Sequence, residues 1–170
     1  MLFVDQSDVG LYPPIGSEWS TRGKQQKVRT KGKNRKVFLF GALDAKTGGL
    51  YAGFWPRKNS DAFIEFLSDL LAAIPEGRLY LVLDNYGVHK SKKTRQFLAT
   101  AGQRISMTFL PTYSPWLNRI EETWRVVKGR AGRNQWRDSV HQLQDAYLDT
   151  MTAMGATTLR RVHTLPDGKE

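Results

Sequence analysis

Three acidic residues, Asp5, Asp84 and Glu121, stand where carboxylates often do chemistry. Asp84 follows the unbroken apolar run Leu79–Leu83, which predicts a strand buried on both faces. Open α/β sheets carry their chemistry just beyond the carboxyl ends of such strands. Asp5 ends a similar apolar run near the start of the chain, and Glu121 lies on a predicted helix. Asp84 alone is equally well explained as a turn residue, and the recurrence of acids in such places favours a site.

Carboxylates gathered in one site repel one another and raise each other's pKa. Divalent cations resolve this conflict, because hard Mg²⁺ binds carboxylate and phosphate oxygens together. Two such ions about 3.5–4 Å apart activate the attacking oxygen and stabilise the leaving oxygen of a phosphoryl displacement. The residues therefore predict a two-magnesium nuclease chemistry, with Mn²⁺ as a substitute.

Composition narrows the class of protein. The chain has 170 residues, a net charge of +10 and no cysteine, which predicts one domain and excludes disulfides and thiolate zinc sites. Its apolar runs are too short to span a membrane, and its first residues do not resemble a secretory signal. These features are compatible with a reducing, cytoplasmic compartment, and the net charge favours nucleic acid rather than a membrane as the partner.

Pro13-Pro14 is followed by a polar loop and then, from Arg22 to Lys36, by a basic run without any acidic residue. Such a run is often only a solvated surface, but uncompensated positive charges favour a phosphate backbone as partner. Gln25 to Thr30 is compatible with a short strand inside the run. The predicted DNA-binding residues of the run are Arg22, Lys24, Lys27, Arg29, Lys31, Lys33, Arg35 and Lys36, and those elsewhere are Lys90, Lys92, Lys93, Arg125 and Lys128.

Periodicity predicts a mixed α/β fold with three antiparallel strands, two parallel strands and flanking helices. We expect a single domain over residues 2–154 and a polar tail over 155–170. Asp44 is interpreted as part of a hairpin turn, and Ser60, Ser91 and Ser139 as helix caps. The expected strands are 2–12, 37–43, 50–55, 79–84 and 105–110, and the expected helices are 60–74, 91–101, 117–130 and 139–154.

The predicted helix at 117–130 turns Glu121 toward the sheet. At about 100° per residue, Glu121 lies about 80° from the centre of the apolar stripe, whereas Glu122 faces water. The stripe consists of Ile120, Trp124 and Val127. Asn118 and Glu121 also fit a capping box, which is the structural alternative for this glutamate.

Two longer motifs carry a resemblance to a known family. LVLDNYGVHKS and FLPTYSPWLNRIEETWRVVK, together with the opening FVDQSDVGLYPPIGSEWSTRGKQQKV, resemble the catalytic core of bacterial insertion-sequence (IS-six-thirty type) and mariner-like transposases of the DDE superfamily. The resemblance covers roughly residues 2 to 130. The interval between Asp84 and Glu121 lies in the mid-thirties, close to the spacing of that family.

This resemblance implies a ribonuclease-H-like fold with Asp5, Asp84 and Glu121 as the metal-binding catalytic triad. It implies hydrolysis at transposon ends, followed by attack of the freed 3′-hydroxyl on target DNA at a TA dinucleotide. The implied partners are DNA and a second copy of the chain in a synaptic complex. Such families precede this core with helix-turn-helix modules, and we expect none before Asp5. The resemblance also implies a bacterial, nucleoid-associated protein. Because Leu2–Val4 already resemble a buried strand without a polar lead-in, we expect the chain to be the carboxyl part of something longer.

Some positions differ from the family pattern or allow two interpretations. Gln6 stands where a second acid commonly follows the first aspartate, and Trp116 and Arg119 replace the usual Asp and Pro. Asp8 is the rival of Asp5, and the alternation of a strand lets only one of them face the site.

The supporting residues predicted for the site are Asn85, His89 and Asn118. The resemblance places His89 near the scissile phosphate, and a local structural hydrogen bond is the alternative. Asn85 either orients Asp84 or serves the turn. Lys128 either holds a phosphate or is an ordinary surface lysine. Trp116, Trp124 and Trp136 are candidates for stacking on unpaired bases, although Trp124 fits the core better.

Two other classes of protein remain open beside a transposase. One is another two-metal nuclease of the same fold, and the other is an inactive, basic DNA-binding remnant.

Overall fold

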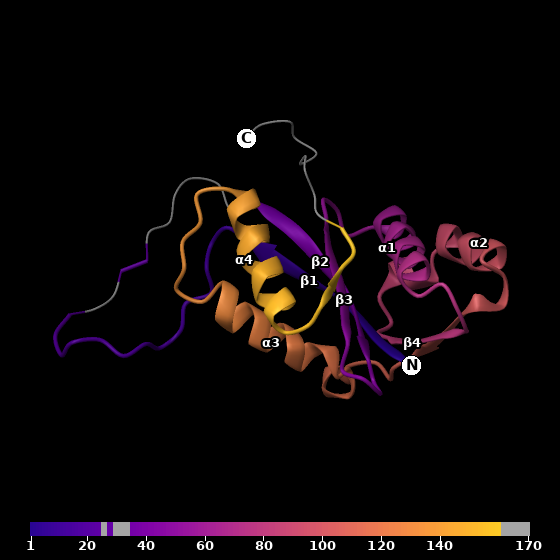
Figure 1. Cartoon of the computed structure of the whole chain (residues 1–170), viewed down its shortest axis with the longest axis horizontal. Coiled ribbons are helices and arrows are strands. Elements are labelled where there is room, and N and C mark those ends of the chain that lie inside the picture. Colours follow the sequence, from indigo (N-terminus) through magenta and orange to yellow (C-terminus); the bar gives the residue numbers. More distant parts are fainter. Residues whose placement is uncertain (25–26, 29–34, 161–170) are drawn as a thin grey trace.

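A six-stranded mixed sheet forms the centre of the molecule (Figure 1). The structure is a computed structural model and describes residues 1–24, 27–28 and 35–160. The strands are β1 (Leu2–Gly10), β2 (Lys36–Asp44), β3 (Leu50–Trp55), β4 (Leu79–Leu83), β5 (Ile105–Phe109) and β6 (Thr157–Thr158). They lie in the order β5-β4-β1-β2-β3-β6.

The sheet has an antiparallel half and a parallel half that meet at β1. β1 pairs antiparallel with β2, which pairs antiparallel with β3, while β4 pairs in parallel with β1 and with β5. This arrangement confirms the predicted three antiparallel and two parallel strands. It also puts the carboxyl end of β4 beside the middle of β1.

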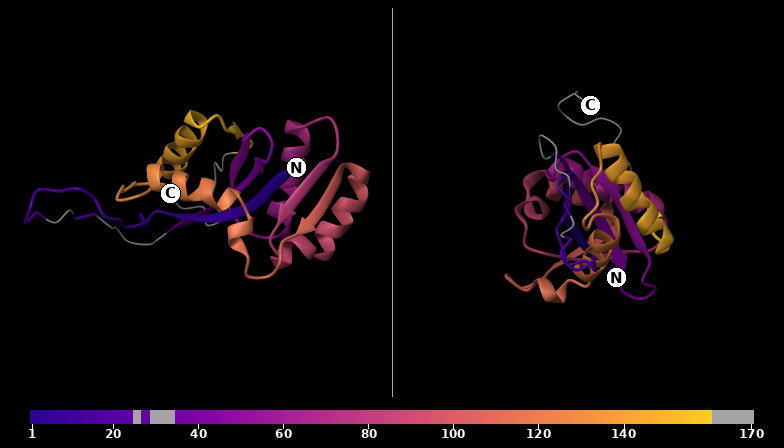
Figure 2. Two further views of the ribbon diagram at one scale, coloured as in Figure 1. Left: turned by 90° about the horizontal axis from the view of Figure 1, so that it is seen from below. Right: turned by 90° about the vertical axis from the view of Figure 1, so that its left-hand side faces the viewer.

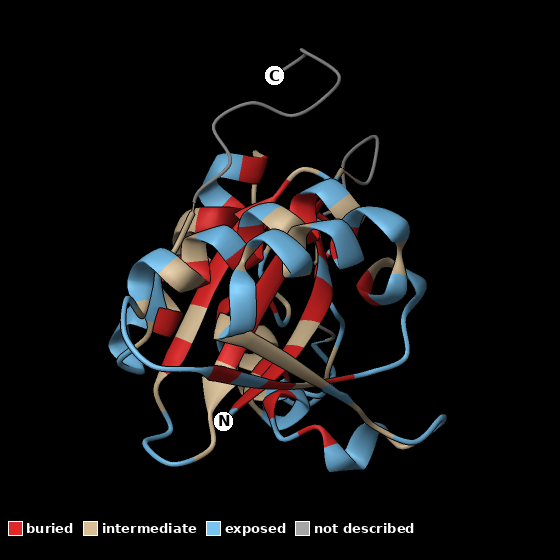
Figure 3. Ribbon diagram, turned by 90° about the vertical axis from the view of Figure 1, so that its right-hand side faces the viewer, coloured by how far each residue is buried: buried red, intermediate tan, exposed pale blue. Residues whose placement is uncertain are grey.

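Helices cover both faces of the sheet (Figure 1). One face packs against α3 (Ile120–Ala131) and α4 (Val140–Ala153), and the other packs against α1 (Ser60–Ala73), with α2 (Lys92–Thr100) beside it. The helices show pale, exposed outer surfaces over red, buried strands in Figure 3. Each helix forms because its apolar residues recur at helical spacing and lose water against the sheet.

Single turns of 3₁₀ helix connect several elements. They span Gly87–Lys90 after β4, Gly102–Arg104 before β5 and Pro115–Leu117 before α3. The last of these ends at Leu117, where the helix 117–130 was predicted to begin, and the α-helix itself begins three residues later, at Ile120. The capping box, which was the structural alternative for Glu121, does not form, because α3 has no side-chain cap. The side-chain amide of Asn118 donates to the carbonyl of Val4 at 3.1 Å.

Helix caps were predicted with mixed success. Ser91 and Ser139 cap α2 and α4, as expected, by accepting from backbone amides. The predicted Ser60 cap is wrong by one residue, because Asn59 accepts from the amide of Ala62 and Ser60 is the first residue of α1. Asp44 accepts from the amide of Lys46 at 2.8 Å, which confirms its role in the turn.

The segment after residue 154, predicted as a polar tail, begins with a strand. β6 pairs in parallel with β3, and the amide of Leu159 donates to the carbonyl of Ala52 at 2.8 Å. Arg160 forms ion pairs with Glu65 and Asp69 of α1. The sheet therefore extends one strand further than the sequence indicated.

Residues 11–24 leave the end of β1 and extend away from the body of the molecule (Figure 2). Asn134 anchors the start of this segment at Gly16 through two hydrogen bonds of 3.0 Å. Its side-chain oxygen accepts from the amide of Gly16, and its side-chain nitrogen donates to the carbonyl of Gly16. No helix among the described residues is long and apolar enough to cross a membrane.

Candidate active site

Asp5 lies in the middle of β1 and faces α3. The indole N–H of Trp124 donates to its carboxylate at 2.9 Å. The close approach of Trp124 depends on Gly41, which pairs with Asp5 across β1 and β2. A Cβ at position 41 would lie 2.5 Å from the indole ring, so only glycine lets α3 settle against the strand that carries Asp5.

The pKa of Asp5 is raised from 3.8 to about 6, chiefly by burial. The charges of Glu121 and Asp84 contribute to this rise, while hydrogen bonds from the Gln6 backbone and the Trp124 indole oppose it. The carboxylate of Asp5 is therefore ionised at neutral pH at a cost in free energy. A positive charge bound beside it would remove part of that cost.

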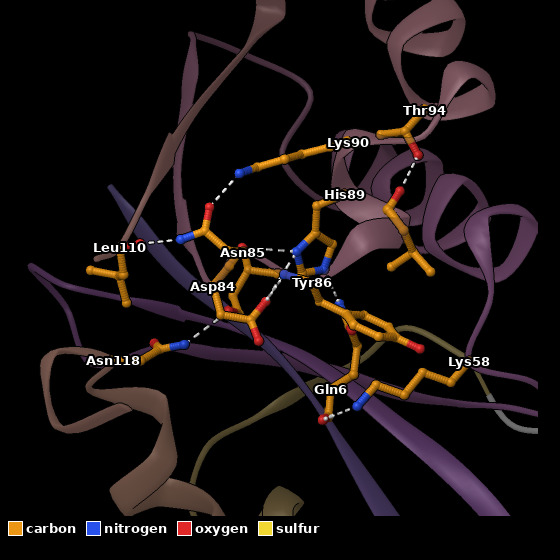
Figure 4. Close-up of polar contacts among 12 residues, drawn as sticks. Gln6, Lys58, Asp84, Asn85, Tyr86, His89, Lys90, Thr94, Leu110 and Asn118 are labelled. Carbon is orange, nitrogen blue, oxygen red and sulfur yellow. Dashed lines mark hydrogen bonds and ion pairs between the residues drawn. The ribbon is translucent and has the colours of Figure 1, made fainter. Parts of the chain in front are cut away.

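Asp84 follows the last residue of β4, where the chain turns away from the sheet. Its carboxylate accepts from the amide of Tyr86 at 3.1 Å, and Nδ1 of His89 lies 3.2 Å from both its Oδ1 and its carbonyl oxygen (Figure 4). The hydrogen bond from His89 lowers the pKa of Asp84, and the Tyr86 amide and the charge of Lys58 lower it as well. Asp84 is thus an exposed but oriented carboxylate.

His89 is a buried residue that contacts the carboxylate of Asp84. Its ring is only 2% exposed and lies 4.5 Å, centroid to centroid, from the ring of Phe63. The amide nitrogen of Gln6 lies 2.7 Å from Nε2 of His89, so Nε2 is the acceptor and the ring proton sits on Nδ1, facing Asp84. The local hydrogen bond considered for His89 is therefore present, and its place near a scissile phosphate stays a prediction.

Glu121 lies in the first turn of α3 with its side chain exposed. Ile120, Trp124 and Val127 are buried as predicted, and Glu122 points to water, where it pairs with Arg125 at 2.8 Å. The backbone at Asn118 anchors this turn, because its carbonyl accepts from the amide of Glu121 at 3.1 Å. The helix therefore turns Glu121 and Glu122 in different directions, as the helical arithmetic predicted.

One cavity of about 320 Å³ is lined by Asp5, Asp84 and Glu121 together with Asn85 and Asn118. Three acids from β1, from the end of β4 and from α3 thus open onto the same space. Asn118 is only 4% exposed, and its Oδ1 has no hydrogen-bond partner among the described residues. Within the same described residues, no three acidic or histidine side chains lie close enough together to hold a metal ion.

The donor chemistry of this cavity fits a hard divalent cation. Carboxylate and amide oxygens are the ligands such ions prefer, and the unpaired Oδ1 of Asn118 lacks a donor or an ion that would satisfy it. The spacing of the side chains is wider than in a formed metal site. Asp5, Asp84 and Glu121 are the residues that would hold the ion, with Asn118 beside them.

Asp5, and not Asp8, is the aspartate of β1 that lines the cavity. Asp5 lines the cavity, whereas Asp8 does not; Asp8 lies three residues along β1, and its carboxylate is 4.0 Å from Nζ of Lys58. The alternation of the strand turns the two carboxylates to opposite faces of the sheet.

Asn85 ties the ends of two strands together. Its side chain donates to the carbonyl of Leu110 at 2.5 Å and accepts from Lys90. It therefore holds the turn after β4 against the end of β5, which is the turn role considered for it. Lys90 in turn lies over the ring of Phe109, 4.4 Å from its centroid.

The predicted DNA-binding residues are spread over several surfaces. Arg22, Lys24 and Lys27 are exposed on the segment after β1, while Lys93 and Arg125 are already paired with Asp61 and Glu122. Lys36, Lys90 and Lys92 are exposed, and Arg35 and Lys128 are half-buried. Arg29, Lys31 and Lys33, and most of the expected strand at 25–30, lie outside the described residues.

A family profile described as "DDE superfamily endonuclease" matches residues 1–144. This chain belongs to that family. A relative from Shigella sonnei, the "Insertion element IS630 uncharacterized 39 kDa protein", is 35% identical over 144 residues, which cover 84% of this chain and 42% of the relative. The resemblance to insertion-sequence transposases is therefore confirmed.

Solved structures show the same fold for this DDE-family chain. The Mos1 transposase paired-end complex with left transposon end has a TM-score of 0.66 at 18% identity, over 89% of this chain and 47% of that one. The mariner Mos1 paired end complex with Mg has a TM-score of 0.65 at 20% identity, over 90% and 48% of the two chains. The predicted ribonuclease-H-like fold is confirmed. The chain spans less than half the length of these relatives.

Sequence reasoning missed two contacts of the DDE-family site. Trp124 was assigned to the core, and it is buried, but its N–H also holds Asp5. Gln6 was noted only as a departure from the family pattern, yet it holds His89. Their positions in the sequence could have indicated both contacts. Trp124 follows Glu121 by about one helical turn, and Gln6 lies next to Asp5 in β1 and therefore faces the other side of the sheet.

Proposed function

We propose that residues 2–154 form the catalytic domain of a transposase that cleaves DNA phosphodiester bonds at transposon ends and joins the freed 3′-hydroxyl to target DNA at TA sites. The observation that carries the proposal is that Asp5, Asp84 and Glu121, from three separate elements, line one cavity in a chain of the DDE family. Two divalent ions, when bound there, would supply activation of the attacking oxygen and stabilisation of the leaving one.

The chain's own residues prepare this chemistry in three ways. The Trp124 indole orients Asp5, and His89 with the Tyr86 amide orients Asp84. Asn118 fastens the start of α3 to β1 through the carbonyl of Val4, which keeps the helix that carries Glu121 beside the strand that carries Asp5. These contacts restrict the carboxylates before any ligand arrives, as effective catalysis requires.

DNA is the proposed substrate because the acidic cavity belongs to a chain with a net charge of +10. Exposed Arg22, Lys24 and Lys27 provide positive charge away from the cavity, which suits contacts to the phosphate backbone on either side of a cut. The Mos1 relatives are described as paired-end complexes with transposon DNA or with Mg. By the same reasoning we propose that two copies of this chain act together on paired ends.

The test is nicking of supercoiled plasmid in Mg²⁺, with Mn²⁺ as a second metal and EDTA as the blank. Asp84→Asn and Glu121→Gln should each abolish nicking. Glu76→Gln, in the exposed turn between α1 and β4, is the control and should nick as the unaltered chain does, because Glu76 lies outside the cavity. Intact nicking in Glu121→Gln would contradict the site assignment.

Strand transfer requires a second assay. A pre-cut oligonucleotide ending in a 3′-hydroxyl should become joined to target plasmid in the presence of Mg²⁺, and sequencing of the junctions reads the target site. Nicking without joining would identify a nuclease of the same fold instead of a transposase. Absence of both activities in every metal would indicate an inactive DNA-binding domain.

A further inference from the structure

Two large aromatic side chains beside the cavity are exposed to solvent. Tyr113 is 90% exposed and Trp116 is 76% exposed, although aromatic rings gain more from burial than most side chains. Both lie on the loop between β5 and α3. Single exposed apolar residues need no explanation, but two rings on one short loop at the edge of a candidate active site do.

The loop that carries these rings is fixed at both of its ends. At its start, the amide of Leu110 donates to the carbonyl of Leu83 (2.9 Å), and the carbonyl of Leu110 accepts from Asn85. At its end, Asn118 is buried and donates to Val4. The exposed rings are therefore held out by an anchored loop rather than carried on a free one.

The backbone within the loop is strained at Tyr113. This residue has a φ of +57°, a left-handed conformation that is unusual for any residue other than glycine. Tyr113 lies between Pro111 and Pro115, each of which fixes φ at its own position. Strain of this kind concentrates at functional sites, where the surrounding structure maintains it.

The two rings face adjoining hollows that share part of their walls. Tyr113 lines the cavity that holds the three carboxylates. Trp116 lines a neighbouring groove of about 570 Å³ together with Arg119. Asn118 and Glu121 line both spaces. A strand whose phosphate lies at Glu121 would thus have Tyr113 on one side and Trp116 on the other.

We infer that Tyr113 and Trp116 form a stacking site for unpaired nucleotides on the two sides of the phosphate that the proposed function would cleave. This inference rests on the proposed function and adds the state of the substrate to it. Aromatic side chains stack on the faces of bases, and these faces are available only where a base is unpaired or terminal. The site therefore favours DNA that is frayed or single-stranded next to the scissile bond, and Arg119 supplies positive charge beside Trp116.

The experiment compares binding of three oligonucleotides to the whole chain in EDTA, where no chemistry occurs. One is a full duplex, the second is the same duplex with a single-stranded fork, and the third is that fork with abasic positions in its unpaired arm. We expect the unaltered chain to bind the fork about tenfold more tightly than the duplex, and the abasic fork to lose this preference.

Two substitutions test the rings themselves. Tyr113→Ala and Trp116→Ala should each remove most of the preference for the fork, while affinity for the duplex stays within about twofold. Trp116→Phe should retain the preference, whereas Trp116→Leu, which keeps apolar bulk but no stacking face, should not. Trp19→Ala is the matched control, because Trp19 is fully exposed on the segment after β1, and it should leave the ratio unchanged.

Three results would overturn the inference. One is equal affinity of the unaltered chain for fork and duplex, and another is a fork preference that survives Tyr113→Ala and Trp116→Ala. The third is a change of oligomeric state in Trp116→Ala, which would assign the ring to contact with a second copy. Because binding is read without metal, a failure of plasmid nicking would refute the proposed function and leave the stacking result to be judged separately.

Discussion

Replacement of Asp5 by asparagine should stabilise the metal-free protein while abolishing its activity. Burial and neighbouring charges raise the pKa of Asp5 from 3.8 to about 6. Each pKa unit corresponds to 1.36 kcal/mol, so ionised Asp5 costs the fold about 3 kcal/mol above pH 6. Asparagine removes the charge and keeps an oxygen that accepts from the Trp124 indole.

The sign of this effect depends on pH. The folded protein holds the Asp5 proton more tightly than the unfolded chain does, so the cost is absent below pH 3.8 and complete above pH 6. Thermal unfolding in EDTA should therefore show Asp5→Asn to be more stable by about 6–12 °C at pH 8. The difference should shrink as the pH falls and vanish near pH 3.5.

The matched control is Asp8→Asn, the same substitution three residues along β1. The side chain of Asp8 is 50% exposed, so its replacement should change stability by less than about 0.5 kcal/mol. An Asp5→Asn variant that is no more stable than the parent at pH 8, or equally more stable at pH 3.5, would refute the electrostatic account of the cavity.

Four further predictions concern the supports of the site and the DNA surface. Trp124→Phe removes the hydrogen bond to Asp5 and should lower the free energy of unfolding by about 1.5–3 kcal/mol at pH 8 in urea titrations. Loss of this hydrogen bond also raises the pKa of Asp5, so the acidic limb of the pH profile of plasmid nicking should move to higher pH. Gly41→Ala places a Cβ 2.5 Å from the Trp124 ring, so it should lower the free energy of unfolding by about 1–3 kcal/mol and remove most of the nicking activity. The control Gly129→Ala, where a Cβ on α3 meets open space, should leave stability unchanged or raise it. Gln6→Leu leaves Nε2 of buried His89 without its donor and should raise the Mg²⁺ concentration needed for half-maximal nicking; unchanged metal dependence would assign Gln6 to folding alone. Neutralising Arg22 and Lys24 together should flatten the slope of log affinity for duplex DNA against log salt by about 2, and an unchanged slope would exclude them from the DNA interface.

The spacing of apolar residues along the chain predicted the strands and helices well, because this spacing decides which face of each element is buried. The apolar run before Asp84 and the stripe on α3 placed that acid and Glu121 toward a common edge, and the structure puts them around one cavity. Strand alternation separated Asp5 from Asp8 in the same way, although it left open which of the two faces the cavity.

The sequence did not predict contacts that join distant segments. The Gln6–His89 hydrogen bond spans 83 positions and depends on how β1 and β4 align, which no local propensity encodes. Asn118 and Glu121 satisfied the pattern of a capping box, but α3 begins only at Ile120 and has no side-chain cap, and the side-chain amide of Asn118 reaches the carbonyl of Val4 on β1. β6 has only two residues and exists because the edge of β3 offers unpaired backbone groups.

Asp5 and Gln6 are neighbours in β1, but their side chains contact residues on opposite faces of the sheet. Asp5 faces the layer of α3, while Gln6 faces the layer of α1 and reaches the histidine that orients Asp84. Because side chains alternate along a strand, inserting or deleting one residue within β1 ahead of Asp5 would exchange the two faces. The carboxylate would then point toward Phe63 and His89, and the amide toward the indole. This strand therefore tolerates most substitutions more readily than any change in its length, so selection on β1 should act more strictly on the number of residues than on their types.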